Sequence, residues 1–444
     1  MTSAETSKSP AGSDIFVFIA LLILNLGMAW YAAPGRPQAP REVVIRSGVG
    51  EDLLAGLTRG RQGLIGSLYW APLPTLIALP LLRLPPLTAS GGADGAFILS
   101  AAIGAAFLGT LLNGWLRRTG ARTGIRIVVT LALVLSPPFR LCVNQGSSEL
   151  FFSFFGVGAV CFLLNWWETE HLRSLAYLAL ALMLAIVTRY QAILLFLGAL
   201  AVVGLHLLLR RRGKKYTEAT LTVFLVPPLY VAFLWVMTNR LLMGDAWFFL
   251  RGLAPSYGSW SHCLSALREG CPWRLFLGLA AIAALAWLVS RVATWRATLL
   301  SGLLLVAASF VFWRGPLAEL TVPTSQADSE LREKVIPYLN EDHSGDWIVV
   351  AGYRGYEIAN LMPDRGRQRL HFTLSFYLDQ VLESTRERRL YLLVPKPAGA
   401  DLWEDIVLKY AGIFENGASF TVHEASWRYW RLWRVVRMDE TDRR

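Results

Sequence analysis

Charged residues are scarce in this chain of 444 residues, and that scarcity bounds its class. Asp, Glu, Lys and Arg make up 17% of the sequence, whereas soluble domains carry about 25%. Hydrophobic residues reach 54%, and the mean hydropathy is +0.42. Such a composition excludes an ordinary soluble enzyme and predicts a polytopic α-helical membrane protein.

Acidic residues are the scarcer charge, with 32 Asp and Glu against 43 Lys and Arg. Much of the basic excess lies in short clusters beside apolar runs, RRTGAR at 117–122 and RRRGKK at 210–215. Clusters of this kind anchor the cytoplasmic ends of membrane spans. The charge balance therefore predicts a membrane as partner and no nucleic acid.

Cysteine is also rare, with 4 in the chain, and none forms a C-x-x-C pair or a zinc-type spacing. The histidines form no local metal pattern, so no metal site is predicted. Cys142 and Cys161 lie in apolar runs and are expected to pack as small apolar residues. Cys263 and Cys271 lie in one loop, and we expect a disulfide between them if that loop faces away from the reducing cytoplasm.

Long apolar runs predict a membrane domain over residues 1–317 with about 9–11 spans, at about 20 residues for each crossing. The runs lie at 15–33, 96–116, 125–143, 149–167, 172–188, 190–209, 217–238, 274–290 and 297–313. The first is interpreted as an uncleaved span, with signal-peptide cleavage after Ala33 as the alternative. A further run, 64–87, contains five prolines. It is predicted as a broken span, a re-entrant piece or a short tilted helix.

The basic clusters also predict which ends of the spans share a side. If both face the cytoplasm, four spans lie between them, and the turns at 144–148 and Arg189 face the opposite side. The first outer loop is then 33–67, and 239–273 is another outer loop. With the N-terminus inside, this arrangement requires that 64–87 does not cross the membrane fully.

Beyond residue 318 the sequence becomes rich in charge, and 318–444 is predicted as a small α/β domain outside the cytoplasm. Helices are expected at 328–340, 376–387 and 402–414. Strands are expected at 346–352 and 389–395, with 419–425 and 430–437 as a closing pair. About 120 residues suffice to bury a core of their own.

Two charged positions interrupt the apolar chain. Glu149 opens a span after Ser147, and it either complements the exposed N–H groups of the helix start or serves a binding site. Arg189 must lie at a turn, because 172–209 as one helix would be about 57 Å long. There it either reaches the headgroups or binds a phosphate with its fork of donors. Arg140 is expected on the same side, in a similar role.

Several segments together resemble the GT-C type membrane glycosyltransferases, which are related in layout to the protein O-mannosyltransferases and the aminoarabinose lipid A transferases. The resemblance lies in SPPF, SSELFFSFFGVGAVCFLLNWW, LALALMLAIVTRYQAILLF, NRLLMGDAWFFLRGLAPSYGSW and YWAPLPTLIALPLL. It covers about residues 15 to 313. In that family an acidic residue opens a span, and an arginine follows roughly one helical hairpin later.

The resemblance implies an enzyme of the cytoplasmic membrane. It would move a sugar from a polyprenyl-phosphate lipid donor to an envelope glycan, lipid or protein acceptor on the outer face. The family's catalytic base is an Asp of the first outer loop, which implies Asp52 here, with the adjacent Glu51 as the alternative base. The order is Glu-Asp, and the family's following Tyr is missing. Asp52 as a solvated residue of a polar loop is the alternative.

The same resemblance implies that the substrate is bound by Glu149, Arg189, Arg140, Tyr190 and Gln191. It fixes no cofactor and leaves a divalent cation, Mg or Mn, open. The leading alternative is a non-catalytic subunit that binds a lipid-linked glycan or docks a protein partner through the C-terminal domain. A transporter predicts broken helices in both halves of the chain, and only 64–87 is clearly broken.

Overall fold

The computed structural model describes residues 11–32, 41–65, 71–84, 94–118, 120–189, 192–211, 213–247, 329–341, 346–351, 354–362, 370–373, 389–396 and 421–435. These residues divide into two compact units. The membrane unit holds the described residues of 11–43 and 71–237. The sheet unit holds those of 44–65, 238–247 and 329–435.

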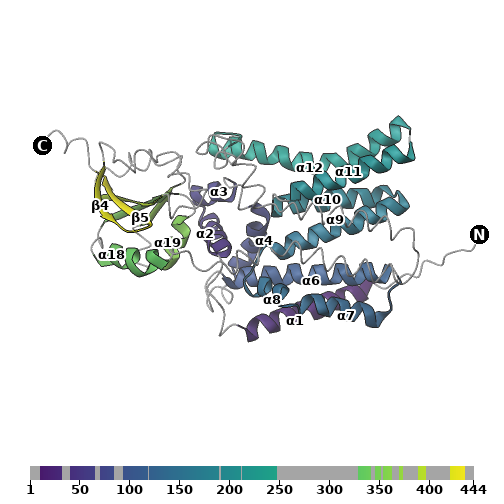
Figure 1. Ribbon diagram of the computed structural model, residues 1–444, viewed down its shortest axis with the longest axis horizontal. Helices are drawn as coiled ribbons and strands as arrows, with labels where there is room; N and C mark the ends of the chain where they lie inside the picture. The colour runs from purple at the N-terminus through teal and green to yellow at the C-terminus, as the bar shows by residue number, and fades with distance from the viewer. Residues whose placement is uncertain are drawn as a thin grey trace, which may run out of the picture. The chain divides into compact units, whose positions relative to one another are not determined.

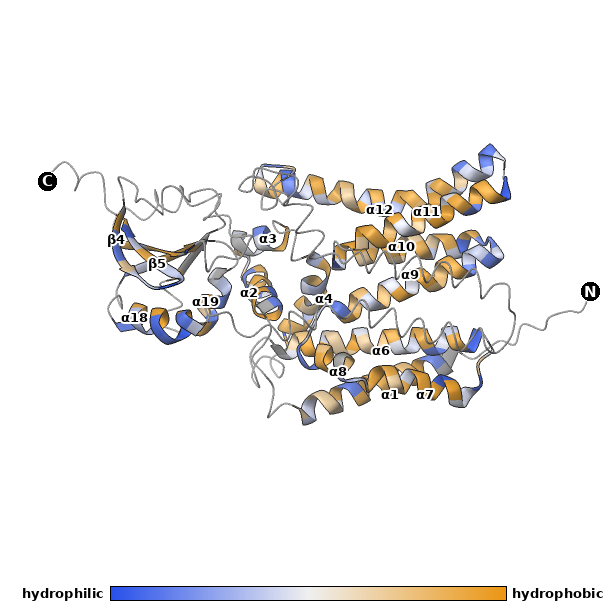
Figure 2. Cartoon of the chain, in the orientation of Figure 1, coloured by the Kyte–Doolittle hydropathy of each residue, from blue (hydrophilic) through white to orange (hydrophobic). Residues whose placement is uncertain are grey.

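Helices make up the membrane unit, and long neighbours run side by side (Figure 1). They are α1 (Ala11–Tyr31), α4 (Pro72–Leu82), α6 (Asp94–Arg118), α7 (Thr123–Val134), α8 (Pro137–Asn144), α9 (Glu149–Thr169), α10 (Leu172–Thr188), α11 (Ala192–Arg210) and α12 (Lys214–Met243). Helix α1 packs on α6, α6 on α9, and α10 on both α9 and α11. Figure 2 shows apolar residues along these helices and hydrophilic residues at the turn between α11 and α12.

Among the described helices, five are long and apolar enough to cross a membrane. They are Asp14–Tyr31, Gly95–Arg118, Glu149–Thr169, Ala192–Arg210 and Lys214–Met243. The shorter α10 packs closely along α9, and its Leu175, Leu178 and Leu182 are fully buried. The chain is therefore a helical membrane protein, as its composition predicted. The runs expected at 274–290 and 297–313 lie outside the described residues.

The apolar run predicted as a span at 125–143 does not form one continuous helix. Instead of one helix over 125–143, the chain forms α7 and α8 with a break at Leu135 and Ser136. Ser136 precedes a proline pair and is extended, with φ −61° and ψ 139°. A residue before proline is driven out of the helical region by the proline ring, and Pro137 then starts the next helix favourably.

Among its described residues, the proline-rich run 64–87 contains the end of α3 and the short helix α4. Its 11 residues span about 16 Å at 1.5 Å per residue, whereas the hydrocarbon core is about 30 Å thick. Pro72 lies in its first turn, where a missing N–H costs nothing, and Pro80 lies inside it. This agrees with the short-helix alternative, and α4 by itself does not cross the membrane.

The sheet unit combines a mixed five-stranded sheet with short helices. Its strands are β1 (Trp347–Ala351), β2 (Leu370–Thr373), β3 (Leu390–Pro395), β4 (Thr421–Ser426) and β5 (Trp430–Val435), in the order β2-β1-β3-β5-β4. Strand β1 is parallel to β2 and β3, whereas β5 is antiparallel to β3 and β4. Its helical segments are α2 (Arg41–Leu54, from Val44 onward), α3 (Thr58–Ile65), the π-helical turn η2 (Leu331–Val335), α18 (Ile336–Glu341) and α19 (Arg354–Leu361).

One face of the sheet is covered by η2, α18 and α19, and the core lies between them. Ile348, Leu393 and Leu432 of the sheet pack there against Leu339 and Ile358 of the helices. The predicted strands at 346–352 and 389–395 and the closing pair are present, and so is the helical segment of 328–340. The helices expected at 376–387 and 402–414 lie outside the described residues. Sequence patterns did not indicate α19 and β2.

The first outer loop expected at 33–67 is largely helical, because α2 and α3 fill its described part. Gly56 separates these two helices with φ +72°, a left-handed conformation that suits glycine. The Asp52 carbonyl accepts the backbone N–H of Leu57 across this turn at 2.9 Å. Asp52 therefore lies near the C-terminus of a helix and not in an irregular loop.

Candidate functional site

The predicted Glu149 and Arg189 form an ion pair in the membrane unit. Glu149 is the first residue of α9, and Arg189 directly follows α10. The helices run antiparallel as packed neighbours, which brings the start of α9 to the end of α10. The Arg189 Nη2 atom contacts the Glu149 Oε1 atom. Both side chains are largely removed from solvent, with 18% and 5% exposed respectively.

A second carboxylate, from Glu42 of α2, completes this cluster. Its Oε2 atom lies 3.3 Å from Nη2 of Arg189, and the side chain is 13% exposed. The Ser148 hydroxyl donates a hydrogen bond to the other oxygen of Glu42. We call Glu42, Ser148, Glu149 and Arg189 the acid–arginine cluster. With all its groups ionised, it holds two negative charges and one positive charge, so its net charge is negative.

Local backbone geometry fixes both members of the central pair. The backbone N–H of Glu149 donates to the hydroxyl of Ser147 at 3.3 Å, so Ser147 helps to satisfy the start of α9. Arg189 leaves the helix in an extended conformation, with φ −153° and ψ 131°. Its carbonyl accepts the N–H of Ala192 at 3.0 Å. The charged side chains are thus held where two helix ends meet.

Separating these charges would cost much free energy, because a buried ion without its partner keeps its desolvation penalty. Two of the roles expected from the sequence, Glu149 as a residue that only complements a helix start and Arg189 as one that only reaches the headgroups, do not describe the site fully. Glu149 does open a helix, yet it also contacts a guanidinium. Arg189 contacts two carboxylates, so it does not merely reach toward headgroups. An anion that binds Arg189 has to share it with Glu42 and Glu149.

Asp52 belongs to the sheet unit and has a different partner. The Tyr356 hydroxyl, from α19, donates to Oδ2 of Asp52 at 2.7 Å. Asp52 is 7% exposed and Tyr356 also 7%, so the solvated-residue alternative for Asp52 is wrong. Its neighbour Glu51 is exposed.

Close packing of α2 against Tyr356 supports this hydrogen bond. A Cβ atom added to Gly48 would lie 2.2 Å from Cδ1 of Tyr356. Real Cβ atoms do not approach other heavy atoms so closely, so only glycine fits that position beside the ring. The helix can therefore approach α19 closely enough for the Asp52–Tyr356 contact.

Arg140 lies on α8, which packs against α9. Its Nε atom is buried and has no hydrogen-bond partner among the described residues. On the same helix, the Cys142 thiol is buried and within range of the charges of Glu42, Glu149 and Arg189. An arginine with a buried Nε donor, on a helix that packs against α9, has the chemistry to bind an anion.

Other predicted residues fall outside the description. Tyr190 and Gln191 lie outside the described residues, and so do Cys263 and Cys271 with their expected disulfide. Cys142 and Cys161 are buried free thiols, as expected for small apolar positions. Among the described residues, no group of three or more His, Cys, Asp or Glu side chains has the arrangement to hold a metal ion.

Sequence reasoning missed Glu42, Ser148 and Tyr356. Glu42 and Arg189 are separated by 147 positions, and Tyr356 and Asp52 by 304. No periodicity in one sequence reports such pairings. Ser148 adjoins Glu149, so its position at the same helix start was the only available signal.

No protein-family model matches the chain, and no curated protein matches its sequence. Among solved structures, the chain is similar to ArnT from Cupriavidus metallidurans, a crystal structure with bound undecaprenyl phosphate. The similarity covers 96% of this chain and 98% of that chain, with 11% sequence identity and a TM-score of 0.39. At this identity and TM-score, the similarity assigns neither a family nor an activity to the chain.

Proposed function

We propose that this protein is a membrane glycosyltransferase that moves a sugar from a polyprenyl-phosphate donor to an envelope glycan, lipid or protein acceptor. The acid–arginine cluster carries the proposal. Its charged side chains lie at one end of membrane-length helices, while the clusters at 117–122 and 210–215 lie at the other end. Charged groups in such a place are costly, and they are typical of functional sites.

The donor phosphate would be bound by arginine. In this proposal Arg140 offers its buried Nε donor, and Arg189 is shared between carboxylates and phosphate. The guanidinium charge stabilises the phosphate as it leaves the anomeric carbon, because donors aimed at developing charge lower the barrier. Glu149 and Glu42 then orient Arg189 and keep it from binding anions indiscriminately. Tyr190 and Gln191 remain proposed as substrate contacts.

Asp52 is the proposed catalytic base. It would take the proton from the acceptor hydroxyl or amine as that group attacks the sugar. Its hydrogen bond from Tyr356 holds one carboxylate oxygen in place, which supports a defined orientation for the other. Tyr356 also supplies, from a distant segment, the tyrosine that does not follow Asp52 in the sequence.

We further propose that the protein lies in the cytoplasmic membrane, with the sheet unit's C-terminal strands on the outer side. In that location the sheet can dock a protein partner. A divalent cation, Mg or Mn, stays a proposal that chelation tests; among the described residues, no group of three or more ligands is arranged to hold it.

Replacing Asp52 with Asn tests the proposed base. The change keeps the side chain's shape and its capacity to accept the Tyr356 hydrogen bond, while it removes the basic oxygen. We expect a loss of about 10²–10⁴-fold in sugar transfer, the usual contribution of a positioned general base. Transfer from polyprenyl-phosphate sugar to envelope lipid or glycan would be measured in membranes, with binding of the donor lipid measured in parallel.

Glu51→Gln is the matched control, because Glu51 is the exposed neighbour of Asp52. It should keep nearly full activity. An Asp52→Asn variant with full activity would remove Asp52 from the mechanism. A variant that no longer binds the donor would instead assign Asp52 to substrate binding.

A non-catalytic subunit is the second candidate, and the residue order Glu51-Asp52 without a following Tyr favours it. In this reading the protein holds a lipid-linked glycan without transferring its sugar. The wild-type protein would then bind donor lipid and leave it unconsumed, with or without acceptor. Turnover by the purified protein would exclude this candidate.

A further inference from the structure

A pocket of about 480 Å³ lies in the membrane unit at the helix ends opposite the acid–arginine cluster. It forms where α6 ends and where α9 turns into α10. Its described lining residues are Arg118, Phe162, Asn165, His171, Leu172, Arg173, Ser174 and Tyr177. No residue in this set is acidic, and two are arginines.

Both arginines are available to a ligand. Arg118 ends α6, and Arg173 lies in the first turn of α10. Each is exposed at the pocket, and neither has an ion-pair partner among the residues that the structure describes. The start of α10 adds a further attraction for anions, because the first N–H groups of a helix lack acceptors within it and carry partial positive charge.

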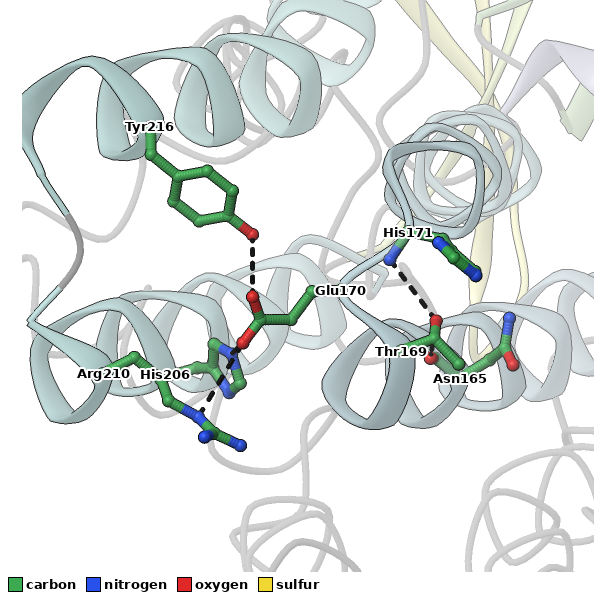
Figure 3. Close-up of polar contacts among 7 residues, drawn as sticks. All are labelled: Asn165, Thr169, Glu170, His171, His206, Arg210 and Tyr216. Atoms are coloured by element: carbon green, nitrogen blue, oxygen red, sulfur yellow. Dashed lines mark hydrogen bonds and ion pairs between the residues drawn. The ribbon is translucent and has the colours of Figure 1, made fainter. Parts of the chain in front are cut away.

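The carboxylate closest in sequence to the turn is directed elsewhere. Glu170 follows α9 with φ 54°, a left-handed conformation that is uncommon outside glycine. Its carboxylate lies 3.2 Å from Nε2 of His206 and 3.8 Å from Nε of Arg210, and it accepts the Tyr216 hydroxyl at 3.4 Å. Figure 3 shows this carboxylate pointing toward α11 and α12, while His171 lies on the other side of the turn. The pocket's arginines are therefore not neutralised by it.

Hydrogen bonds hold the pocket's polar wall in place. The Asn165 amide donates to the Ser174 hydroxyl at 2.5 Å and thus joins α9 to α10. The Thr169 hydroxyl donates to the Asn165 carbonyl at 2.6 Å and accepts the His171 N–H at 3.3 Å. A site formed before its ligand arrives loses less ordering entropy on binding.

A second wall is apolar and aromatic, and it lies one helical turn further into α9 and α10 than Asn165 and Ser174. The rings of Phe162 and Tyr177 lie with their centroids 5.4 Å apart, and Leu172 stands beside them. A ligand that suits both walls carries a phosphate at one end and hydrocarbon at the other. The pocket also lies among the basic clusters that mark the cytoplasmic ends of spans, and basic pockets between spans on that side bind anionic headgroups.

We propose that this pocket binds the phosphate-bearing headgroup of an anionic phospholipid of the cytoplasmic leaflet. The arginines contact the phosphate oxygens, Asn165 and Ser174 contact the glycerol oxygens, and Phe162 and Tyr177 pack against the first methylene groups. This proposal does not rest on the proposed function, because the pocket and the acid–arginine cluster lie at opposite ends of the helices.

The test compares lipid binding by the full chain and by Arg118→Ala/Arg173→Ala, both purified in a neutral detergent. Short-chain phosphatidylglycerol is titrated, and bound lipid is counted by native mass spectrometry, with the shift in melting temperature as a second readout. We expect roughly a tenfold loss of affinity for each arginine removed. This loss is the lower end of the range for hydrogen bonds to charged groups. Phosphatidylcholine should bind weakly to both proteins.

Arg122→Ala/Lys215→Ala is the matched control. It removes the same charge from exposed positions at the starts of α7 and α12, outside the pocket lining. It should bind phosphatidylglycerol like the wild type. Equal losses in both double variants would show general attraction to positive charge and overturn the proposal, as would unchanged binding in the arginine variant.

Two further arms decide the source of the phosphate and guard against misfolding. If inorganic phosphate stabilises the protein as strongly as the lipid does, the ligand is a soluble anion, and the assignment to a lipid is overturned. Tyr177→Glu, at a residue 48% exposed, keeps both arginines but puts a carboxylate into the pocket. It should abolish phosphatidylglycerol binding without changing the melting temperature of the lipid-free protein, and retained binding would contradict the assignment.

Discussion

At the scale of single residues, the acid–arginine cluster shows how this protein keeps charge inside an apolar bundle. Glu149 is nearly buried, and Arg189 is placed against it by the break between α10 and α11. Glu42 adds a second carboxylate from a helix far away in the sequence. Each charged group thus has a partner of opposite sign, which is the condition under which buried charges persist.

Arg189→Ala should destabilise the protein strongly, because it removes the guanidinium that both Glu149 and Glu42 contact. Removing one partner of a buried pair costs about 3–5 kcal/mol, and partial exposure of Arg189 should keep the loss at the lower end. Thermal unfolding in detergent measures it. Arg189→Ala/Glu149→Ala should recover part of the stability, and a double variant no better than the single one would contradict the coupling.

Tyr356→Phe should destabilise the sheet unit, because it leaves the buried Asp52 carboxylate without the hydroxyl that donates to it. Losing one hydrogen bond to a buried charged group costs about 1.5–3 kcal/mol. Denaturant unfolding followed by tryptophan fluorescence would report the loss. In an Asp52→Ala background the same change should matter much less, and an equal effect in both backgrounds would show that the hydrogen bond is not its cause.

At the scale of elements, glycine and proline set where helices approach and where they stop. Gly48 lets α2 lie against the ring of Tyr356. The Ser136–Pro137 step divides α7 from α8. A third case is α4, an 11-residue helix with Pro72 in its first turn and Pro80 inside it. The glycine contact between α2 and α19 in particular supports the position of Asp52.

Gly48→Ala should therefore destabilise the protein, although alanine favours helices. Its Cβ would meet the Tyr356 ring, and such overpacking costs about 1–3 kcal/mol. Gly114→Ala in α6 is the control, since a Cβ there meets nothing within 4 Å, and it should be neutral or slightly stabilising. The two melting temperatures give the comparison. A Gly48→Ala variant as stable as Gly114→Ala would show that α2 can move away from the ring.

At the scale of the whole molecule, successive helices run in opposite directions, and this predicts which membrane face each turn reaches. Helices α9 to α12 bring Glu149 and Arg189 to one membrane face, and they bring Arg210 and Lys214 to the other. The positive-inside rule assigns the second face to the cytoplasm. The two spans predicted at 274–290 and 297–313 return the chain to the outer face, so the C-terminal strands should lie outside.

Cysteine labelling checks this assignment in a variant without native cysteines. A cysteine at Lys214, in the α11–α12 turn, should react with a membrane-impermeant maleimide only after the membrane is opened. A cysteine at Val422, an exposed position of β4, should react in intact cells or right-side-out vesicles. The same accessibility at both positions would overturn the topology and the proposed outer location of the sheet.

The sequence predicted those parts of the structure that depend on local pattern. Apolar runs identified the long helices, and the position of Arg189 at a turn followed from the length of 172–209. The meeting of Glu149 with Arg189 at one end followed from adjacent antiparallel spans. Partners such as Glu42 and Tyr356 were not predictable, because contacts over 147 and 304 positions depend on tertiary packing and leave no periodic signal.

The Asp52–Tyr356 hydrogen bond can form only late in synthesis of the chain. Its two residues are 304 positions apart, and a ribosome adding about 5–20 residues per second needs roughly 15–60 s to make the segment between them. During that interval α2 has already been synthesised, while the tyrosine that covers its carboxylate does not yet exist. Any nascent or truncated chain that stops before α19 therefore lacks the hydroxyl that donates to Asp52 in the folded protein.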